Sequence, residues 1–534
     1  MDDRPIPFLV EPADTGLLES PPDSVYTRRC KPVSTIDTHP QAGVLAGVET
    51  RSIDYVPQSE RRGRLFDQST VWFAGSAQLL TIATGAIGIW LGLNLAWTLI
   101  ALALGTILGT IPVSAHATQG PHLGLPQMIQ SRPQFGRYGA LFIWAMAIVV
   151  YWGYVVLGGN LIGVTAEGLG WGSASTWAIV VCLVALVLAI FGYHWLHAAQ
   201  RYISYALVAV ILIYVVGLGV TGQIPAEFFN LAGTFQVGPF LAVVIAAAAY
   251  QLTWAFFVSD YSRYMPVDTK RGTIVAITSG GLFLGLFSFM AIGAIAASLM
   301  PSLLESSPGL SDRLDGDATG FAVSLVETGK LVFPGLGELV LIAGGLGLIG
   351  LMAMCVYGGS LTLITAVDSI RPVRPTRRIR VITILIVGLT GAVAAALVPT
   401  DFLNNNLYTV LIVLAYLMGP WTAVNLTDFF FVRRGHYSVR EMFRRDGMYG
   451  LWSWRGILAY VAAVAAMIPF MYIAGLYEGP IAVALGGVDI AFFVGIPVGG
   501  ALYWLFCRKL DLDAELVTIA SADKDIDAVA RPIE

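Results

Sequence analysis

The stretch Ala246–Pro266, AAAAYQLTWAFFVSDYSRYMP, decides how this chain is to be interpreted. It begins as an uninterrupted apolar helix, carries Gln251 and Trp254 inside the apolar run, and ends with Asp260 and Arg263. A helix in lipid must satisfy its backbone polar groups internally, so a break in its backbone is tolerated only where it lines a cavity or packs inside protein. The stretch therefore indicates a membrane helix that is broken at a buried site.

The composition of the whole chain agrees with this interpretation. Of its 534 residues 56% are hydrophobic and 12% are charged, about half of the roughly 25% charged residues found in soluble domains. The net charge of -4 sits mostly in the polar ends and one loop, so we expect no nucleic-acid partner. The four cysteines are far apart, and no His/Cys cluster has the spacing of metal ligands. We therefore expect no disulfide, no metal and no cofactor.

Apolar runs long enough to cross a bilayer recur along most of the chain and predict an all-α polytopic membrane protein. Twelve such runs are found, and an even number places both ends of the chain on one side of the lipid bilayer. Their approximate ranges are 70–94, 97–116, 138–165, 175–193, 202–222, 238–258, 273–299, 333–357, 379–398, 406–431, 455–475 and 489–507.

The lysines and arginines of the loops predict on which side of the membrane the two ends of the chain lie. With a cytoplasmic N-terminus, 17 of these residues lie in inner loops, whereas the outer loops hold only Arg313 and Lys330. Basic residues favour the cytoplasmic side of membrane proteins. We therefore expect a multi-pass protein of the plasma membrane with both termini in the cytoplasm.

A second predicted helix has the same broken character as the opening stretch. The run STVWFAGSAQLLTIATGAIGIW, residues 69–90, carries Gly75, Ser76 and Gln78 in its first half. The two helices are five apart in the chain, as expected of two inverted five-helix repeats whose discontinuous helices build a site at the bilayer midplane. The alternative is that the small residues only permit close helix packing, as we expect for Gly105 with Gly109 and for Gly281 with Gly285.

An ordered series of motifs carries a family resemblance. From residue 52 the chain reads SIDYVPQSERRGRLFDQSTVWFAGSAQ, then ATGAIG, then LGTIPVSAHATQGPHLGLPQMIQSRPQFGRYGALF, and after the sixth helix SDYSRYMP. Over about residues 53–434 the chain resembles the purine and cytosine permease branch of the nucleobase:cation symport family. The resemblance implies a leucine-transporter-type fold with 5+5 inverted-repeat helices and two peripheral helices, which agrees with twelve spans.

The resemblance also implies a domain organisation. We expect a cytoplasmic N-terminal tail at 1–66 and a ten-helix transport core at 67–431, followed by a cytoplasmic loop and peripheral helices 11 and 12 at 432–507. The two repeats of the core are expected at about 70–222 and 238–431. A C-terminal cytoplasmic tail at 508–534 completes the chain, and both tails are expected to be disordered because they are polar and lack apolar periodicity.

The substrates that the resemblance implies are flat heterocycles of the cytosine, purine and allantoin class. Such a ring needs aromatic stacking partners and side chains that donate and accept hydrogen bonds. By resemblance, Trp152 in VVYWGYVVLGGN stacks on the substrate, and Gln78 with Ser76 nearby is its amide partner. Tryptophans that only pack or anchor the helices are the alternative. The remaining substrate residues expected by resemblance are Tyr250, Gln251 and Trp254 at the sixth helix, and Cys355 where family members carry Asn.

The coupling ion is predicted less directly. In sodium-coupled members of this fold the ion lies between carbonyls of the first helix, here Ala74 and Ala77, and hydroxyls of the eighth, where this chain has Ile349 and Gly350. Because sodium prefers hard oxygen ligands, this departure favours the proton over sodium as the coupling cation. No carboxylate lies at mid-membrane, so the proton site is unassigned and uncoupled transport stays open.

Carboxylates near cytoplasmic helix ends are candidates for an inner gate. Asp260 with Arg263 follows the sixth helix, and Asp428 in LTDFFFVRRGHY repeats the pattern after the tenth. The alternative is an exposed ion pair at the headgroups, worth only about 0–1 kcal/mol. His116 also lies at a helix end, and we expect it at the surface.

The sequence excludes an enzyme more firmly than it selects a substrate. It shows no HExxH, no GxSxG and no nucleotide-binding loop. We expect a secondary active transporter that imports a nucleobase or related heterocycle by alternating access. The alternatives are a sodium-coupled or uncoupled carrier of another small solute, such as a hydantoin, vitamin or amino acid, and a nutrient sensor on the same scaffold. The sequence makes no prediction of oligomeric state.

Overall fold

The computed structural model describes residues 53–191, 193–232, 235–306, 319–373, 376–399 and 402–529. All of them fall in one compact unit, Gln41–Arg531. Most of the predicted N-terminal tail, residues 1–52, lies outside the described residues. The tail was expected to reach residue 66, but Ile53 and Val56 are buried against the bundle and the first long helix begins at Leu65.

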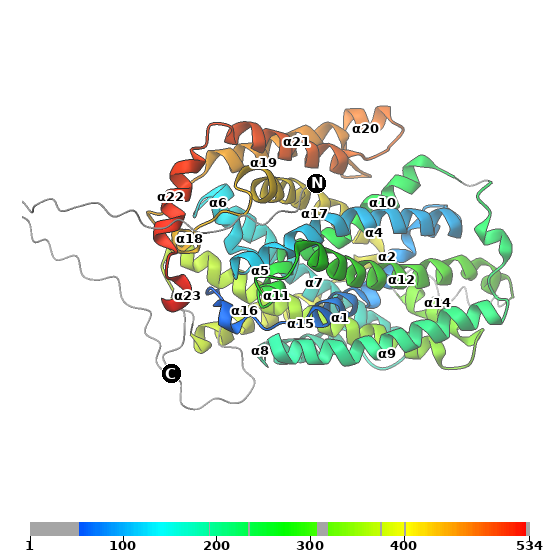
Figure 1. Ribbon diagram of the computed structural model, residues 1–534. Coiled ribbons are helices and arrows are strands. Elements are labelled where there is room, and N and C mark those ends of the chain that lie inside the picture. The colour runs from blue at the N-terminus through cyan, green and yellow to red at the C-terminus, as the bar shows by residue number, and fades with distance from the viewer. Residues whose placement is uncertain are drawn as a thin grey trace, which may run out of the picture. The chain divides into compact units, whose positions relative to one another are not determined.

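The described part of the chain is almost entirely helical (Figure 1). The long helices and the pieces of the two broken ones are α1 (Leu65–Ser76), α2 (Leu79–Gly85), α3 (Ile87–Trp90), α4 (Leu95–Ala117), α7 (Ala140–Gly168), α8 (Ala174–Phe191), α9 (Tyr193–Val220), α10 (Val237–Leu252), η4 (Thr253–Phe256), α11 (Val258–Ser262), α12 (Arg271–Ser306), α15 (Leu336–Ile370), α16 (Arg377–Leu397), α17 (Phe402–Thr427), α19 (Trp454–Met467) and α21 (Ala491–Cys507).

Short elements connect these helices. They are η1 (Gln58–Glu60), α5 (Gln119–Leu123), η2 (Ile129–Ser131), α6 (Arg132–Phe135), η3 (Ala226–Phe229), α14 (Thr319–Lys330), the π-helical η6 (Asp428–Val432), α18 (Val439–Phe443), η7 (Ile468–Phe470), α20 (Pro480–Ala484), α22 (Leu512–Ala522) and α23 (Ile526–Val529). The strands β1 (Tyr472–Ile473) and β2 (Tyr477–Glu478) form one antiparallel pair, in which Tyr472 faces Glu478 and Ile473 faces Tyr477.

Every predicted span coincides with a helix or a broken pair of helices. Within the described residues, nine helices are long and apolar enough to cross a membrane, and up to eleven spans result if each of two bent pairs counts as one. The first bent pair, Leu65–Ser76 with Leu79–Trp90, turns by 61° at the place where the sequence predicts a break. The shorter apolar helix Trp454–Phe470 takes the position of the eleventh predicted span. The fold is thus an all-α polytopic membrane fold.

Glycines set the closest helix contacts, and they pair the two broken helices in the same way. A Cβ at Gly285 of α12 would lie 2.5 Å from the Phe73 carbonyl oxygen of α1, and a Cβ at Gly105 of α4 would lie 2.3 Å from the Val244 carbonyl oxygen of α10. The packing role expected of these glycines is therefore confirmed. Each broken helix packs on the second helix of the other repeat, as inverted repeats require.

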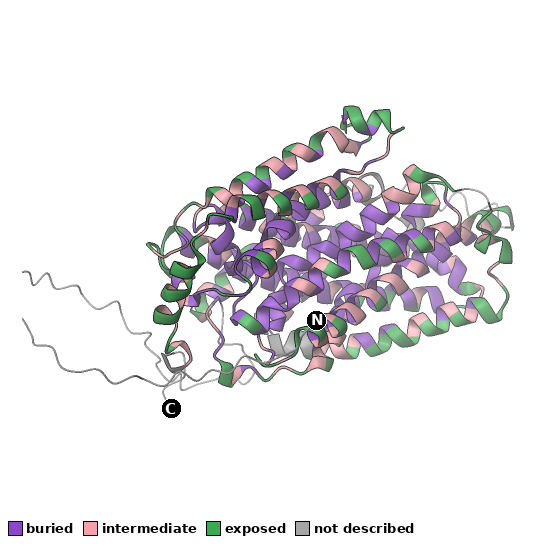
Figure 2. Cartoon of the chain, turned by 45° about the horizontal axis from the view of Figure 1, so that its top comes forward, coloured by how far each residue is buried: buried purple, intermediate pink, exposed green. Residues whose placement is uncertain are grey.

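The buried residues run along the middle of the bundle, and the exposed ones lie on its outer helices (Figure 2). The C-terminal segment departs from the expectation of disorder, because residues 512–529 form α22 and α23. The Asp523 carboxylate accepts hydrogen bonds from Ser438 Oγ (3.0 Å) and from the Val439 backbone N–H (2.7 Å). Asp527 accepts one from the Tyr55 hydroxyl (2.9 Å). Asp523 thus holds this segment onto the loop after α17, and Asp527 holds it onto the segment before α1.

Candidate functional site

The break between α1 and α2 is built around Gln78. Its backbone is extended, with φ -157° and ψ 169°, which ends the helical hydrogen-bonding pattern. The side-chain oxygen caps the next helix by accepting from the Leu80 N–H at 2.7 Å. The amide nitrogen donates to the Thr81 hydroxyl at 3.1 Å and to the Tyr250 hydroxyl. One buried amide therefore restarts the helix and links it to α10.

The second break lies opposite, where α10 ends and the chain makes the 3-10 turn η4. The Tyr250 hydroxyl is also within 2.9 Å of Thr81 Oγ1, so it lies between the two broken helices. Thr253, the first residue of η4, donates its hydroxyl to the Tyr250 carbonyl oxygen at 2.7 Å. Phe257 ends the turn with φ -139° and ψ 8°, after which α11 begins. The backbone groups freed by the break are thus partly satisfied by neighbouring hydroxyls, as broken membrane helices require.

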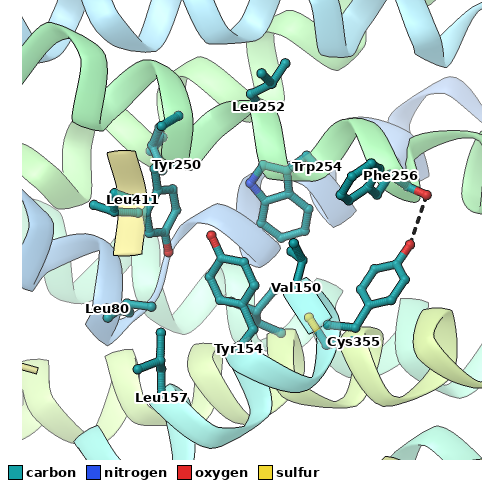
Figure 3. Close-up of a cluster of buried hydrophobic side chains, with 14 of the residues drawn as sticks. Leu80, Val150, Tyr154, Leu157, Tyr250, Leu252, Trp254, Phe256, Cys355 and Leu411 are labelled. Atoms are coloured by element: carbon teal, nitrogen blue, oxygen red, sulfur yellow. Dashed lines mark hydrogen bonds between the residues drawn. The ribbon is translucent and has the colours of Figure 1, made fainter. Parts of the chain in front are cut away.

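Two tyrosines of α7 complete this cluster and were missed from the sequence. The Tyr154 hydroxyl shares a hydrogen bond of 3.0 Å with the Thr253 hydroxyl, and its ring lies edge-on to the Tyr250 ring at 6.1 Å between centroids. The Tyr151 hydroxyl donates to the Phe256 carbonyl oxygen at 2.9 Å. Figure 3 shows the side chains of Tyr154 and Tyr250 pointing toward each other. The spacing of three residues between Tyr151 and Tyr154 is the signal that could have placed both on one helix face.

Trp254 lies in the same region and carries an unsatisfied donor. Its ring contacts Trp72 edge-on at 5.7 Å and Phe257 at 5.0 Å. Within the described residues its indole Nε1 and the Ser76 hydroxyl have no hydrogen-bond partner, although both are buried. Cys355 of α15 belongs to this cluster as well (Figure 3). The structure therefore brings together Ser76, Gln78, Tyr250, Trp254 and Cys355 of the predicted substrate residues.

Two predicted substrate residues point elsewhere. Trp152 is half-buried, and its Nε1 donates to the Thr390 hydroxyl of α16 at 3.2 Å. One residue turns a helix by about 100°, so the face of α7 that presents Tyr151 and Tyr154 to the breaks turns Trp152 toward α16. The Gln251 amide donates to the Thr110 hydroxyl of α4 at 2.7 Å, which ties α10 to α4. Contrary to the expectation, the polar groups of Trp152 and Gln251 thus bond α16 and α4 and do not join the cluster at the breaks.

The contact between α1 and α15 also differs in register from the prediction. A Cβ at Gly347 would lie 2.4 Å from the Ala77 carbonyl oxygen, whereas a Cβ at Gly350 would meet the Gln200 amide of α9 at 2.5 Å. Gly347, and not the predicted Ile349 or Gly350, therefore faces Ala77. Ala74 is buried inside α1. Like the predicted Ile349 and Gly350, Gly347 brings no side-chain hydroxyl to the break.

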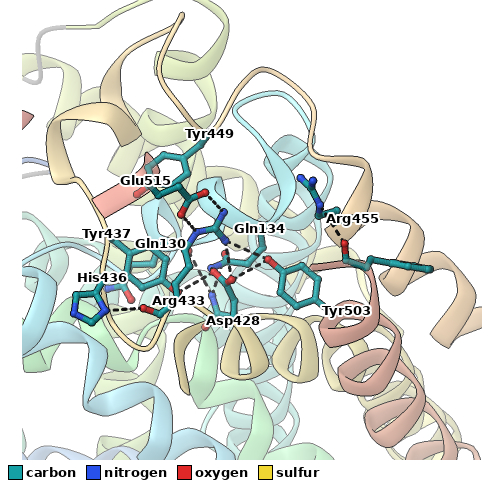
Figure 4. Close-up of polar contacts among 12 residues, drawn as sticks. Gln130, Gln134, Asp428, Arg433, His436, Tyr437, Tyr449, Arg455, Tyr503 and Glu515 are labelled. Carbon is teal, nitrogen blue, oxygen red and sulfur yellow. Dashed lines mark hydrogen bonds and ion pairs between the residues drawn. The ribbon is translucent and has the colours of Figure 1, made fainter. Parts of the chain in front are cut away.

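Asp428 lies at the centre of a buried polar network at the end of α17 (Figure 4). Its carboxylate accepts from Arg433 Nη1 at 2.7 Å, from the Gln134 amide at 2.7 Å, and from the hydroxyls of Tyr437 (2.8 Å) and Tyr503 (3.0 Å). Its side chain is 0% exposed and that of Arg433 is 6% exposed. The alternative of an exposed headgroup ion pair is therefore wrong for Asp428.

Arg433 carries this network to the C-terminal segment. Its Nε donates to Glu515 Oε2 at 2.8 Å and its Nη2 to Glu515 Oε1 at 2.9 Å, a two-pronged contact with α22. Burial opposes the positive charge, but the facing Asp428, together with Tyr503 and Glu515, raises the pKa of Arg433 well above its ordinary value. Burial and the neighbouring Asp428 also raise the pKa of the Tyr437 phenol well above its ordinary value. The Arg433 guanidinium thus stays positively charged and the Tyr437 phenol stays a hydrogen-bond donor.

A chain of side-chain amides links Asp428 to the second predicted gate residue. Asp260 of α11 is buried and accepts from the Gln127 N–H at 2.8 Å. The Gln127 amide donates to His116 Nδ1 (3.1 Å) and to Gln119 Oε1 (3.0 Å). The Gln119 amide donates to Asn425 Oδ1 at 2.7 Å, one turn before Asp428. Hydrogen bonds therefore connect the end of the sixth membrane helix to the end of the tenth.

His116 and Arg263 are also buried at this end of the bundle. The His116 ring is stacked on Trp421 with 4.9 Å between centroids and 4° between planes, so the expectation of a surface position is wrong. Arg263 is fully buried, and its Nε contacts the Asp260 carbonyl oxygen at 3.3 Å. The predicted gate residues are therefore buried inside protein and are not an exposed ion pair.

Solved structures of low sequence identity share this fold. Mhp1, a nucleobase-cation-symport-1 family transporter in a closed conformation with bromovinylhydantoin bound, matches with a TM-score of 0.68 and 16% identity over 90% of this chain and 99% of its own. A Na⁺-coupled sialic acid symporter in an outward-open state matches with a TM-score of 0.56 and 12% identity over 84% and 90%. With two helices broken side by side inside the bundle, the chain has a polytopic membrane fold of the leucine-transporter type.

The family follows from the sequence comparisons. The family model described as permease for cytosine/purines, uracil, thiamine, allantoin matches residues 55–495, and the chain belongs to this family. Putative purine-cytosine permease YxlA of Bacillus subtilis is 32% identical over 467 residues, 86% of this chain and 96% of that protein. Allantoin permease of the same species is 21% identical over 493 residues, covering 85% and 92%. Purine-cytosine permease FCY22 of Saccharomyces cerevisiae is 27% identical over 256 residues, covering 46% and 48%.

Proposed function

We propose that the protein imports a nucleobase or a related flat heterocycle of the cytosine, purine and allantoin class, by proton symport with alternating access. The observation that carries the proposal is the cluster at the two helix breaks. There an amide, Gln78, and the hydroxyls of Thr81, Tyr154 and Tyr250 converge among aromatic rings. Aromatic faces suit a π ring, and amides and hydroxyls suit an edge of alternating donors and acceptors.

The unsatisfied groups of the cluster support a polar substrate. A buried donor without a partner costs about 1–3 kcal/mol, and both Trp254 Nε1 and the Ser76 hydroxyl are of this kind within the described residues. A heterocycle between the breaks would replace the direct bond from Gln78 to Tyr250 and accept from such donors. In this account Gln78, Tyr250 and Trp254 bind the substrate, with Ser76 and Cys355 beside them. Tyr154 takes the place at the substrate that the sequence resemblance gives to Trp152.

The contact of α1 with α15 supports the proton over sodium. Sodium prefers about five or six hard oxygen ligands, and α15 has no Ser or Thr between Gly337 and Gly359. The Ala77 carbonyl oxygen faces Gly347, whose backbone is already used in the helix. A sodium ion at this place would lack the side-chain oxygens that a ligand shell needs.

The amide chain between Asp260 and Asp428 supports an inner gate. Asp260 lies on α11, the half of the broken helix that follows the break, while Asp428 follows α17 as the first residue of η6. We assign the gate to these two carboxylates, with Arg263 adjoining the first. Rocking of the helix bundle would separate the two ends and break the hydrogen bonds between them. The arginines beside this end of the bundle support a cytoplasmic side, with both termini inside and the protein in the plasma membrane.

The proposed organisation follows from these roles. Residues 67–431 form the transport core, with the repeats at about 70–222 and 238–431, and 432–507 hold the cytoplasmic loop and the peripheral helices. The residues from 508 onward are cytoplasmic, and α22 among them is bound to the loop by Glu515.

Uptake into proteoliposomes tests the proposal. The purified protein is reconstituted, and uptake of radiolabelled cytosine, adenine, hypoxanthine, uracil and allantoin is measured with thiamine and leucine as competitors. We expect uptake of at least one of these labelled heterocycles and no competition by leucine, with uptake driven by an alkaline interior at a clamped membrane potential. Uptake that needs a sodium gradient would contradict proton coupling, and competition by leucine alone would contradict the substrate class.

A further inference from the structure

An apolar groove runs between α4, α17 and α21 on the outside of the bundle. It encloses about 820 Å³. Its walls come from all three helices and are almost wholly apolar. They include Leu108, Ile111, Ala423, Phe493, Ile496 and Ala501. From Phe492 to Trp504 the groove follows α21 for about 18 Å at 1.5 Å per residue, close to the roughly 15 Å of hydrocarbon in one leaflet.

The groove continues into a pocket of different chemistry at its cytoplasmic end. This pocket encloses about 450 Å³, and Phe431 and Trp504 line both spaces. Its walls include Arg434, Arg508 and His436. α22 covers it because the chain turns by 86° between α21 and α22, so that α22 runs across the end of α21 (Figure 1). The apolar groove, about as deep as one leaflet, thus ends in this basic pocket, the chamber, at the level of the headgroups.

Two of the three arginines that line the chamber are available to bind a ligand. Arg433 is already engaged by Asp428 and Glu515. The Arg434 guanidinium has no hydrogen bond or ion pair within the described residues. The Arg508 guanidinium lies 4.1 Å from the Trp504 ring centroid and keeps its hydrogen-bond donors free for another group. Among the lining residues the three arginines, Arg433, Arg434 and Arg508, outnumber the carboxylates of Asp513 and Glu515. The two arginines without an ion pair in the described part of the chain, Arg434 and Arg508, can both donate to a single phosphodiester.

The backbone at Arg434 shows that this arrangement is held under strain. Its φ is +53°, which makes it the one residue other than glycine with a positive φ in the described part of the chain. Such a conformation costs of order 1 kcal/mol and persists where the surroundings enforce it, often at ligand sites. Here it directs the chain after η6 so that Arg434 lines the chamber and Arg433 reaches Asp428.

From these observations we propose that the groove and chamber form a binding site for one anionic phospholipid. An acyl chain lies in the groove against α4, α17 and α21, and the phosphate lies between Arg434 and Arg508 beneath α22. A lipid held there bridges the tenth and twelfth membrane helices and α22, next to the proposed gate residue Asp428. Its presence does not depend on which heterocycle the protein transports.

Native mass spectrometry of the full-length protein tests the site. The protein is purified in mild detergent, stripped of loosely held lipid and titrated with phosphatidylglycerol or phosphatidylcholine of the same chains. We expect one phosphatidylglycerol to be retained with at least tenfold preference over phosphatidylcholine. We expect Arg434→Gln with Arg508→Gln to reduce its retention at least fivefold. Arg445→Gln, at an exposed arginine outside the chamber, is the matched control.

A second variant tests the groove separately from the charges. Ala501 is exposed within the groove, so Ala501→Phe fills it without disturbing the core. We expect Ala501→Phe to displace the lipid, whereas Ala465→Phe, at an exposed position of α19 outside the groove, leaves it bound. Equal retention of both lipids, or retention unchanged by Ala501→Phe, would overturn the proposal. Should the double arginine variant fail to fold, the Ala501→Phe comparison decides alone.

Discussion

Neutralising Asp428 should destabilise the protein far more than neutralising an exposed carboxylate. Asp428 is fully buried and accepts four hydrogen bonds, of which the one from Arg433 is an ion pair of 2.7 Å. Removing one partner of a buried pair costs about 3–5 kcal/mol. Because Arg433 keeps its contacts with Glu515 after Asp428→Asn, we expect the lower end, about 3 kcal/mol.

The partner substitution Glu515→Gln should cost less. Hydrogen bonds to charged groups contribute about 1.5–3 kcal/mol, and Arg433 keeps Asp428, so we expect about 1–2 kcal/mol. The double variant leaves Arg433 buried without a carboxylate, and its cost should therefore exceed the sum of the single costs by about 1 kcal/mol or more. Asp446→Asn, which affects a side chain 84% exposed, is the matched control and should cost less than about 0.5 kcal/mol.

The assay is reversible unfolding of the purified protein by sodium dodecyl sulfate, followed by tryptophan fluorescence. The four free energies of unfolding give the coupling between Asp428 and Glu515 through Arg433. Costs for Asp428→Asn and Asp446→Asn that are equal within error would refute the buried network. Strict additivity of the two substitutions would refute the role of Arg433 as the shared partner.

Two further predictions concern the breaks and the amide chain. Gly347→Ala would place a methyl group 2.4 Å from the Ala77 carbonyl oxygen, and we expect a loss of about 1–3 kcal/mol in stability and of most uptake. Gly345→Ala, which meets nothing within 4 Å, should leave both unchanged, and equal effects of the two would contradict the close contact. His116→Phe keeps a ring to stack on Trp421 but loses the bond to Gln127, so unfolding experiments should show a loss of about 1–3 kcal/mol. A loss below about 0.5 kcal/mol would show that the amide chain does not depend on His116.

The positions of the membrane helices and of the two breaks could be predicted from the sequence. Length and apolarity decide whether a segment crosses lipid, and polar residues such as Gln78 inside an apolar run mark a break. The direction in which a residue faces could not be predicted in the same way. α7 is apolar on all sides, so periodicity does not distinguish Tyr151 and Tyr154 from Trp152, which lies between them. The register of α15 on α1 could not be predicted for the same reason, because a glycine-rich helix shows no preferred face.

The burial of Asp428 depends on segments far away in the chain. Its partners come from α6, from the loop after α17 and from α21, and Arg433 adds α22. Composition alone indicates a solvated helix end and a disordered tail. Only the packing of these four segments against one another removes the carboxylate from water and orders residues 512–529.

The most direct test of the proposed function is the affinity of site variants for the base that the uptake panel identifies. Equilibrium binding of the radiolabelled base to purified protein is measured for Gln78→Ala and Trp152→Phe. Loss of an amide that pairs with the edge of a heterocycle costs about 1.5–3 kcal/mol, so Gln78→Ala should weaken binding about 10- to 100-fold. Trp152→Phe should change it less than about 3-fold, because that ring faces α16. A large loss for Trp152→Phe with none for Gln78→Ala would contradict a site between the two helix breaks.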